Sequence, residues 1–361
     1  MSKVGIITLP SYFNFGNRLQ CYAMTEAVKK AGADPYVIQR ERPGMPLSFP
    51  RRVYRKMRRV GKSFLTHQKP VSAMDLMNEG RKAAVKRFEL HIPTMVLPGN
   101  GYSARDLFDA LIVGSDQVWN PNWIGDKEDW LFATFARPEQ RFAVSASIGL
   151  DGFADARQEK VVAEGVKGFA RISMRETRGA QLVRECAGID AEVTCDPTLV
   201  LTAEEWREVA DARLTPREPY VFSYILGGVG AEASAVLEEV TDHGRIPVVA
   251  LSDRQKPGEL DAGPAEFIDL VDHASHVVTD SFHGAALGSI FQTPLTIVHR
   301  EGATGMFSRL EQLSQVLGIQ EKVYGSSAFD LGKAGDYDGV PEAIARERAK
   351  FMEYLEGCLN A

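Results

Sequence analysis

Short runs of apolar and β-branched residues alternate with helical patterns along the chain. The first run, residues 4–9, is followed by a loop rich in Pro, Asn and Gly and by a segment, 19–31, with apolar residues at helical spacing before Gly32. Similar short runs recur at 35–39, 110–113, 142–145 and 171–174. Apolar strands that alternate with helices are typical of parallel sheets with both faces covered, so this pattern predicts an α/β fold.

The pattern restarts after a polar break at 216–219. We expect strands at 220–226, 246–251, 277–279 and 295–298, and helices at 231–243, 265–273 and 285–291. With a boundary near 201–215, this predicts two Rossmann-like domains, 1–205 and 206–361, with a cleft between them. A last helix, 342–359, is expected to pack on either domain.

Length and composition agree with a folded protein of two domains. The chain has 361 residues, 44% hydrophobic and 25% charged, and its net charge of -6 argues against a nucleic-acid binder held by a basic surface. Its four cysteines form no CxxC pair, which indicates reduced thiols. The first apolar run is too short for a signal peptide and no run approaches 18 residues, so we expect a cytoplasmic protein.

One segment departs from the acidic average. Residues 42–74 contain nine basic residues and no acidic one, which leaves 33 positive against 48 negative charges elsewhere. Val53, Met57, Val60 and Phe64 follow helical spacing among these cations, which favours peripheral binding to an anionic membrane on its inner face. A solvated basic helix or loop is the alternative. A nucleic-acid arm is disfavoured, because aromatic residues are sparse.

Ligands of open α/β sheets bind beyond the carboxyl ends of strands, so the strand-to-helix turns carry the candidate chemistry. In the first turn, Gly16 and Asn17 open a helix whose free N–H groups are expected to face the cleft. A simple helix cap is the alternative interpretation. The turn lacks GxGxxG, which disfavours a dinucleotide site.

The turn after 110–113 reads Gly-Ser-Asp-Gln-Val-Trp-Asn at 114–120. Asp116 and Gln117 are suited to bind sugar hydroxyls, and Trp119 to stack on a sugar face. The alternative is an Asp that caps a helix beside a tryptophan of the core.

Two further turns offer groups for an anion. Arg175 follows the strand 171–174 and fits a carboxylate or phosphate, unless it only forms a structural ion pair with Asp196. His283 lies in the first turn of the helix after 277–279, where an imidazole can donate to a phosphate or transfer a proton. A purely structural histidine is the alternative.

Taken together, these turns resemble the polysaccharide pyruvyl transferase family. The chain contains its GNxxQ start at 16–20, GSDQxWN at 114–120, SxRE at 173–176, DPT at 196–198 and SFHG at 281–284, in the same order and spacing. Met174 stands where Val is more usual in the SxRE block. The resemblance spans about residues 3–300.

The resemblance implies a glycosyltransferase-B-like pair of domains that moves pyruvate from phosphoenolpyruvate onto a sugar as a ketal. The acceptor would be a sugar of a cell-surface polysaccharide (exopolysaccharide) or its lipid-linked oligosaccharide precursor, and no cofactor would be needed. Arg175 and His283 fall at positions associated with the donor. We expect His283, Arg175 and Asp116 to be catalytic. The wider donor side would comprise Arg175, Ser281, His283, Gly284, Gly227, Gly228 and Arg309. The acceptor side would comprise Asn14, Gly16, Asn17, Gln20, Ser115, Asp116, Gln117 and Trp119.

Ketal formation from an enol phosphate requires protonation at C3, attack of two hydroxyls at C2 and loss of phosphate. Asp116 or Glu176 could act as the base, and cations would stabilise the departing phosphate. No metal is expected, because the sequence has no cluster of His and carboxylates at ligand spacing and no DxD pair at a strand end. The alternatives are a nucleotide-sugar glycosyltransferase with a nucleotide pocket near Gly227 and Gly228, and a non-catalytic glycan-binding protein that tolerates loss of His283.

Overall fold

The computed structural model describes residues 1–9, 14–40, 77–97, 101–125, 128–252, 255–256, 258–300 and 307–361. The predicted basic segment, 42–74, lies outside the described residues, as do residues 10–13 of the first strand-to-helix turn.

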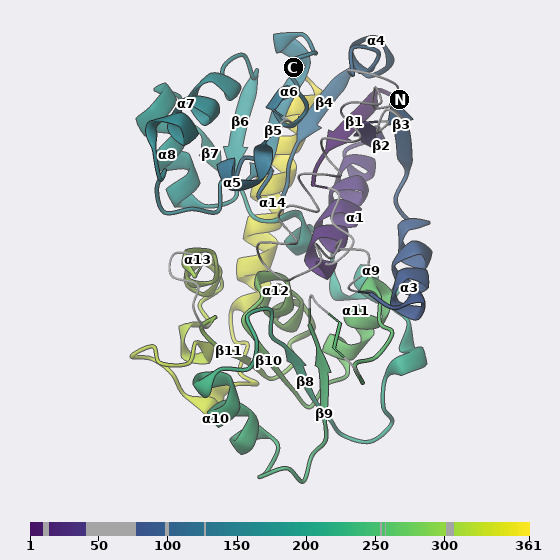
Figure 1. Ribbon diagram of the computed structural model, residues 1–361, viewed down its shortest axis with the longest axis vertical. Helices are drawn as coiled ribbons and strands as arrows, with labels where there is room; N and C mark the ends of the chain where they lie inside the picture. The colour runs from purple at the N-terminus through teal and green to yellow at the C-terminus, as the bar shows by residue number, and fades with distance from the viewer. Residues whose placement is uncertain are drawn as a thin grey trace, which may run out of the picture.

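The larger of two parallel sheets has seven strands in the order β3-β2-β1-β4-β5-β6-β7 and forms the upper half of Figure 1. Its strands are β1 (Lys3–Ile7), β2 (Asp34–Arg40), β3 (Thr94–Leu97), β4 (Ala110–Val113), β5 (Arg141–Ala146), β6 (Arg171–Met174) and β7 (Glu192–Val193). Successive side chains of the central strands enter two different apolar clusters: Ile112 packs in one, and Leu111 and Val113 in the other. Both faces of this sheet are therefore buried, which explains the unbroken apolar runs.

The smaller sheet has four parallel strands in the order β11-β10-β8-β9 and forms the lower half of Figure 1. They are β8 (Val221–Tyr224), β9 (Val248–Leu251), β10 (His276–Thr279) and β11 (Leu295–Ile297). The predicted α/β fold with two Rossmann-like parallel sheets is confirmed.

Helices connect the strands of both sheets. They are α1 (Phe15–Lys30), α3 (Glu79–Glu89), α4 (Ala104–Leu107), α5 (Pro121–Ile124), α6 (Glu128–Leu131), α7 (Ala156–Gly165), α8 (Thr177–Ala187), α9 (Ala203–Arg207), α10 (Ala231–Val240), α11 (Pro264–Asp272), α12 (Phe282–Phe291), α13 (Ser308–Leu317) and α14 (Val340–Leu359). No helix among the described residues is long and apolar enough to cross a membrane.

The two sheets share one apolar core. Phe15, at the start of α1, stacks on Tyr224 at the end of β8 with 5.7 Å between ring centroids and contacts Phe267 of α11 at 5.3 Å. The guanidinium of Arg81 in α3 lies 4.6 Å from the centroid of the same Phe15 ring. Burying a Phe side chain contributes about 2–3 kcal/mol, so this contact fixes the first turn of α1 against the second sheet.

Two helices pack on the half of the molecule to which the chain order does not assign them. Helix α3 packs on α11, where Arg87 pairs with the buried Glu266 at 2.6 Å. Helix α14 runs back behind the larger sheet in Figure 1, and its Tyr354 hydroxyl donates to the carbonyl of Ala143 in β5 at 3.1 Å. The strands change sheet between Val193 and Val221, and the division at residue 205 stays a prediction.

Candidate functional site

The strand order of the larger sheet places a crevice at the carboxyl ends of β1 and β4. The chain runs outward from β1 to one edge and from β4 to the other, and ligands of open α/β sheets bind at such a reversal. Asn17, in the first turn of α1, donates through Nδ2 to Oδ2 of Asp116 after β4 at 3.2 Å. The two turns that flank the reversal are therefore joined directly.

The smaller sheet has the same kind of reversal between β8 and β10. The carboxylate of Asp280, after β10, accepts hydrogen bonds from the N–H groups of Leu226 (2.8 Å) and Gly227 (3.0 Å) after β8. It also accepts one from Nε of Arg300 at 3.0 Å. The Asp280 carboxylate therefore keeps the turn after β8 and the Arg300 guanidinium next to each other.

The two crevices meet where the imidazole of His283 lies against Gly16. His283 is the second residue of α12 and Gly16 the second residue of α1. A Cβ atom at residue 16 would overlap the His283 ring. Only glycine therefore allows this approach between the two helix ends.

Arg175 lies at the end of β6 and is 3% exposed. Its Nη1 donates to Oδ2 of Asp196 at 2.7 Å, and its Nη2 lies 3.6 Å from Oδ1 of Asp116. Burial lowers the pKa of Arg175, but the neighbouring carboxylates outweigh this effect and the pKa lies above its usual value. The ion pair with Asp196, weighed as the alternative to ligand binding, is present.

Asp196 is saturated by its protein partners. Its Oδ1 accepts from the backbone N–H and the hydroxyl of Thr198 at 3.0 and 2.8 Å, and its Oδ2 also accepts from the Ser115 hydroxyl at 3.3 Å. Burial acts to raise its pKa, but Arg175 and the Thr198 amide outweigh it, so the pKa of Asp196 lies below its usual value. Asp196 therefore stays ionised and anchors Arg175.

Asp116 adopts a left-handed backbone conformation, with φ of 61°. Its carbonyl accepts from the N–H groups of Val118 (2.7 Å) and Ser147 (3.1 Å), which stabilises this sparsely populated geometry. Burial favours the protonated carboxyl, but the positive charges of Arg175 and Arg309 outweigh it and lower the pKa of Asp116. The side chain is therefore a carboxylate near pH 7.

His283 is buried, with Nε2 3.8 Å from Oδ2 of Asp196. Among the described residues no group hydrogen-bonds to this Nε2. Burial is the largest influence on its pKa and lowers it below the usual value, although the carboxylates of Asp196 and Asp116 act in the opposite direction. Without a ligand, the ring is therefore neutral near pH 7.

Arg309, in the first turn of α13, joins the smaller sheet's domain to the turn after β4. With the Gln117 amide oriented so that its oxygen faces Arg309, that oxygen accepts from Nη2 and Nη1 at 2.8 and 2.9 Å. Burial lowers the pKa of Arg309 to about 10, so it remains charged at pH 7. One helical turn later, Gln312 binds the carbonyl of Arg175 at 3.1 Å, which fixes α13 against the larger sheet.

The helices that begin at the two crevices present N–H groups without a side-chain cap. Neither Asn14 before α1 nor Ser281 before α12 makes a side-chain capping bond, and neither first turn contains an acidic residue. Helix N-termini carry partial positive charge, so both favour an anion at the point where Gly16 and His283 meet.

The sequence profile of the family described as polysaccharide pyruvyl transferase matches residues 14–298, a span that contains each of these groups except Arg300 and Arg309. The chain belongs to this family. No curated protein gives a significant match to the sequence.

Solved structures with a similar chain path include UDP-GlcNAc 2-epimerase from Neisseria meningitidis bound to UDP-GlcNAc, at 10% identity and a TM-score of 0.47, covering 99% of both chains. A UDP-N-acetylglucosamine 2-epimerase described as putative from Listeria monocytogenes has the same identity and TM-score, covering 99% of this chain and 97% of its own. An E. coli heptosyltransferase has 13% identity and a TM-score of 0.38, and the match covers 95% of this chain and 99% of the heptosyltransferase.

Most predicted site residues of this pyruvyl transferase family member lie together. Asp116, Arg175, His283 and Arg309 influence one another's charge state within one buried cluster, and Gln117 and Asn17 hydrogen-bond to members of it. Ser115 and Gln20 brace the turn after β4, because Oε1 of Gln20 accepts from the Ser115 N–H at 3.2 Å. The roles assigned to these residues stay predictions.

Trp119 requires a correction. It is fully buried, donates from Nε1 to the carbonyl of Leu131 at 3.0 Å and stacks on Phe132 with 5.5 Å between centroids. A ring enclosed on both faces cannot stack on a sugar, so the alternative interpretation, a core tryptophan, is the correct one.

The glycines assigned to the donor side serve the packing of the turns. The N–H of Gly227 is bound by Asp280, and the Arg300 side chain lies directly against its Cα, where a Cβ would contact Cγ at 2.5 Å. At Gly284 a Cβ would lie 2.6 Å from Oγ1 of Thr279. These positions require glycine for close approach, and Gly228, with φ of 92°, for backbone conformation.

Sequence reasoning missed Arg300. It follows β11 by three residues, so its position just after a strand end was the signal that could have found it. A small cavity beside the start of α12 is lined by Asp280, Phe282, His299, Arg300, Phe307, Arg309 and Leu310. Two arginines thus face one cavity next to His283.

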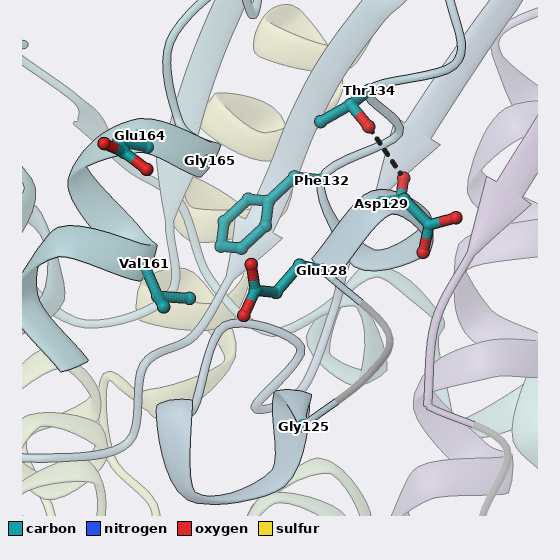
Figure 2. Close-up of a pocket in the computed structure, with 8 residues that line it drawn as sticks. All are labelled: Gly125, Glu128, Asp129, Phe132, Thr134, Val161, Glu164 and Gly165. Atoms are coloured by element: carbon teal, nitrogen blue, oxygen red, sulfur yellow. Dashed lines mark hydrogen bonds between the residues drawn. The ribbon is translucent and has the colours of Figure 1, made fainter. Parts of the chain in front are cut away.

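A wider hollow of about 560 Å³ lies apart from this cluster, between α5, α6 and α7, as Figure 2 shows. It is lined by Gly125, Glu128, Asp129, Phe132, Thr134, Val161, Glu164 and Gly165, none of them a predicted site residue. Within the described ranges, no group of three or more His, Cys, Asp or Glu residues is placed to hold a metal ion.

Proposed function

We propose that the protein transfers pyruvate from phosphoenolpyruvate to two hydroxyls of one sugar, forming a ketal and releasing phosphate. The observation that carries the proposal is the meeting of two uncapped helix ends at a buried cluster whose nitrogen atoms Arg175 Nε, Arg309 Nε and His283 Nε2 lack hydrogen-bond partners among the described residues. A small polyanion supplies the acceptors that these atoms need.

The donor occupies the side of α12 and α13 in this proposal. Arg175 and Arg309 bind its carboxylate and phosphate, and Arg300 lies at the adjoining cavity. A phosphate dianion beside His283 favours the imidazolium, which then protonates C3 of the enol. The arginines and helix ends stabilise the negative charge that develops as phosphate leaves C2.

The acceptor sugar lies on the side of the larger sheet, at Asp116, Gln117 and Asn17. Their side chains flank the crevice between β1 and β4, and Asp116 is held as a carboxylate that can accept hydroxyl hydrogen bonds. We propose a sugar of a cell-surface polysaccharide or its lipid-linked precursor, presented at the inner face of the membrane.

The test is to incubate the protein with phosphoenolpyruvate and nitrophenyl glycosides or lipid-linked sugars, with chelator present throughout. Release of phosphate together with the mass gain of a pyruvyl ketal is expected, and His283→Ala should abolish both while leaving the circular dichroism spectrum unchanged. Turnover of a nucleotide sugar instead would establish the glycosyltransferase alternative. Glycan binding that persists without any turnover would indicate a non-catalytic protein.

A further inference from the structure

Glu176 directly follows Arg175, at the N-cap position of α8, but its side chain does not cap that helix. It turns instead to the loop after β5, where Oε1 accepts from the Ser147 hydroxyl at 3.0 Å, from the Ile148 N–H at 3.0 Å and from the Gly149 N–H at 3.1 Å. Three donors on one oxygen fix the carboxylate in a single orientation.

The second oxygen of Glu176 is in a different situation. Oε2 is buried and accepts no hydrogen bond from any described residue, and it lies 3.9 Å from Nε of Arg175, which is also without a hydrogen-bond partner there. A buried carboxylate oxygen without a donor is costly, so its retention points to a group that donates to it when a ligand binds.

The position of Glu176 fits an acceptor hydroxyl. Its charge acts on both Arg175 and Arg309, the proposed donor cations. On its other side, Gly149, which donates to Oε1, packs against the Gln117 side chain of the proposed acceptor side. Glu176 therefore adjoins both the proposed donor cations and the proposed acceptor side.

Asp116 and Asp196 are less suited to accept that proton. Asp196 uses both oxygens for Arg175, Thr198 and Ser115. Asp116 accepts from Asn17, and the neighbouring cations lower its pKa, which weakens it as a base. Glu176 Oε2, by contrast, is a buried carboxylate oxygen to which no described residue donates.

We propose that Glu176 is the general base for the first addition, an inference that rests on the proposed function. The O–H bond of the sugar hydroxyl breaks and its proton moves to Oε2 of Glu176. The oxygen forms a bond to C2, and the C2–C3 π electrons take a proton from the His283 imidazolium at C3. The product is an adduct that still carries phosphate, with Glu176 protonated and His283 neutral.

The test is Glu176→Gln, which keeps an oxygen for the three donors on Oε1 and replaces Oε2 with an amide that cannot accept a proton. We expect kcat to fall about 100-fold or more, while the thermal shift produced by phosphoenolpyruvate changes little. The pH profile of kcat should lose its acid-side limb. The charged and titratable neighbours Arg175, Arg309, Asp116 and His283 are the same in the variant and the wild type, so the comparison isolates Glu176. Formate should partly restore turnover to Glu176→Ala.

Glu185→Gln is the matched control, because Glu185 lies on the same helix, is 58% exposed and pairs only with Arg178 in a described ion pair. Its kcat should equal that of the wild type. A Glu176→Gln variant within threefold of wild-type kcat, or one that keeps the acid limb while Asp116→Asn loses it, would overturn the assignment of the base alone. A wild-type protein that does not consume phosphoenolpyruvate would overturn the proposed function and this inference with it.

Discussion

The imidazole of His283 packs on the Cα of Gly16, so the first turns of α12 and α1 touch across the two sheets. Each helix follows a strand that borders the reversal of strand order in its own sheet. The contact therefore brings the two places where α/β sheets bind ligands into one site.

A methyl group at this contact should disturb the site more than the fold. In Gly16→Ala the added methyl group overlaps the His283 ring, so the ring or the helix ends must move apart. Such overpacking costs about 1–3 kcal/mol. We expect kcat/KM for phosphoenolpyruvate to fall about tenfold or more with a small decrease in Tm. Gly152→Ala is the control, since nothing lies within 4 Å of a Cβ at residue 152. Equal kinetics for the two variants would show that the contact does not position His283.

Breaking the buried pair between Arg175 and Asp196 should cost much stability. Asp196→Asn leaves a buried guanidinium with weaker partners, and loss of one member of a buried pair typically costs about 3–5 kcal/mol. Glu192→Gln on the adjacent strand removes the exposed pair with Arg171 at 2.8 Å and should cost under about 1 kcal/mol. Urea unfolding of both variants measures the difference, and a similar small loss for the two would contradict the prediction.

Arg175→Lys tests whether Arg175 binds a ligand in addition to Asp196. Lysine keeps the charge but cannot contact Asp196 and an anion with a planar fork, so we expect kcat/KM for phosphoenolpyruvate to fall about tenfold to 100-fold. Arg178→Lys, on the surface of α8, is the control and should behave as the wild type. Unaltered kinetics for phosphoenolpyruvate in Arg175→Lys would show that Arg175 serves only its structural ion pair with Asp196.

The stability of the protein should decrease between pH 6.5 and 4 because of His276. Burial lowers the pKa of this ring in β10 from 6.5 to about 4, so the folded state binds its proton less readily than the unfolded state. The contribution is complete above pH 6.5 and is lost as pH falls toward 4, by about 3 kcal/mol at most.

Urea unfolding at pH 7 and pH 4.5 measures this effect. His276→Asn should flatten the pH dependence. His243→Asn should leave it unchanged, because that ring is 78% exposed and its backbone has a positive φ that Asn tolerates. A slope that is the same in all three proteins would assign the effect to other groups.

The basic segment 42–74 predicts salt-sensitive binding to anionic vesicles. Each cation near such a surface contributes about 1 kcal/mol, so reversing the charge of Arg55, Lys56, Arg58 and Arg59 should abolish co-sedimentation with the vesicles. Turnover of a lipid-linked acceptor should slow, and that of a short soluble acceptor should not. Equal losses for both acceptors would place the segment in the fold or the site.

The sequence by itself determined the layered α/β fold, because the apolar period and turn signals such as Gly32 after α1 are local properties of the chain. It located the strand ends at Ala110–Val113 and Arg171–Met174 to the residue. It missed β3 and β7, the two edge strands of the larger sheet, because runs of four and two residues are too short to give a clear pattern. The same local reasoning selected Asp116, Arg175 and His283 as polar groups at strand ends.

The tertiary structure decided which of those strand ends meet and which side chains face the site. Trp119 and Asp116 are three residues apart in one motif, yet the left-handed turn at Asp116 places its carboxylate in the cluster while Trp119 enters the core. His283 reaches Gly16 where Phe15 packs α1 on the smaller sheet, and Arg309 reaches Gln117 where Gln312 fixes α13 against the larger one. These contacts join residues that are about 190 and about 270 positions apart in the chain. Their energy depends on burial and on distances in space, and the local pattern of the sequence holds no information on either.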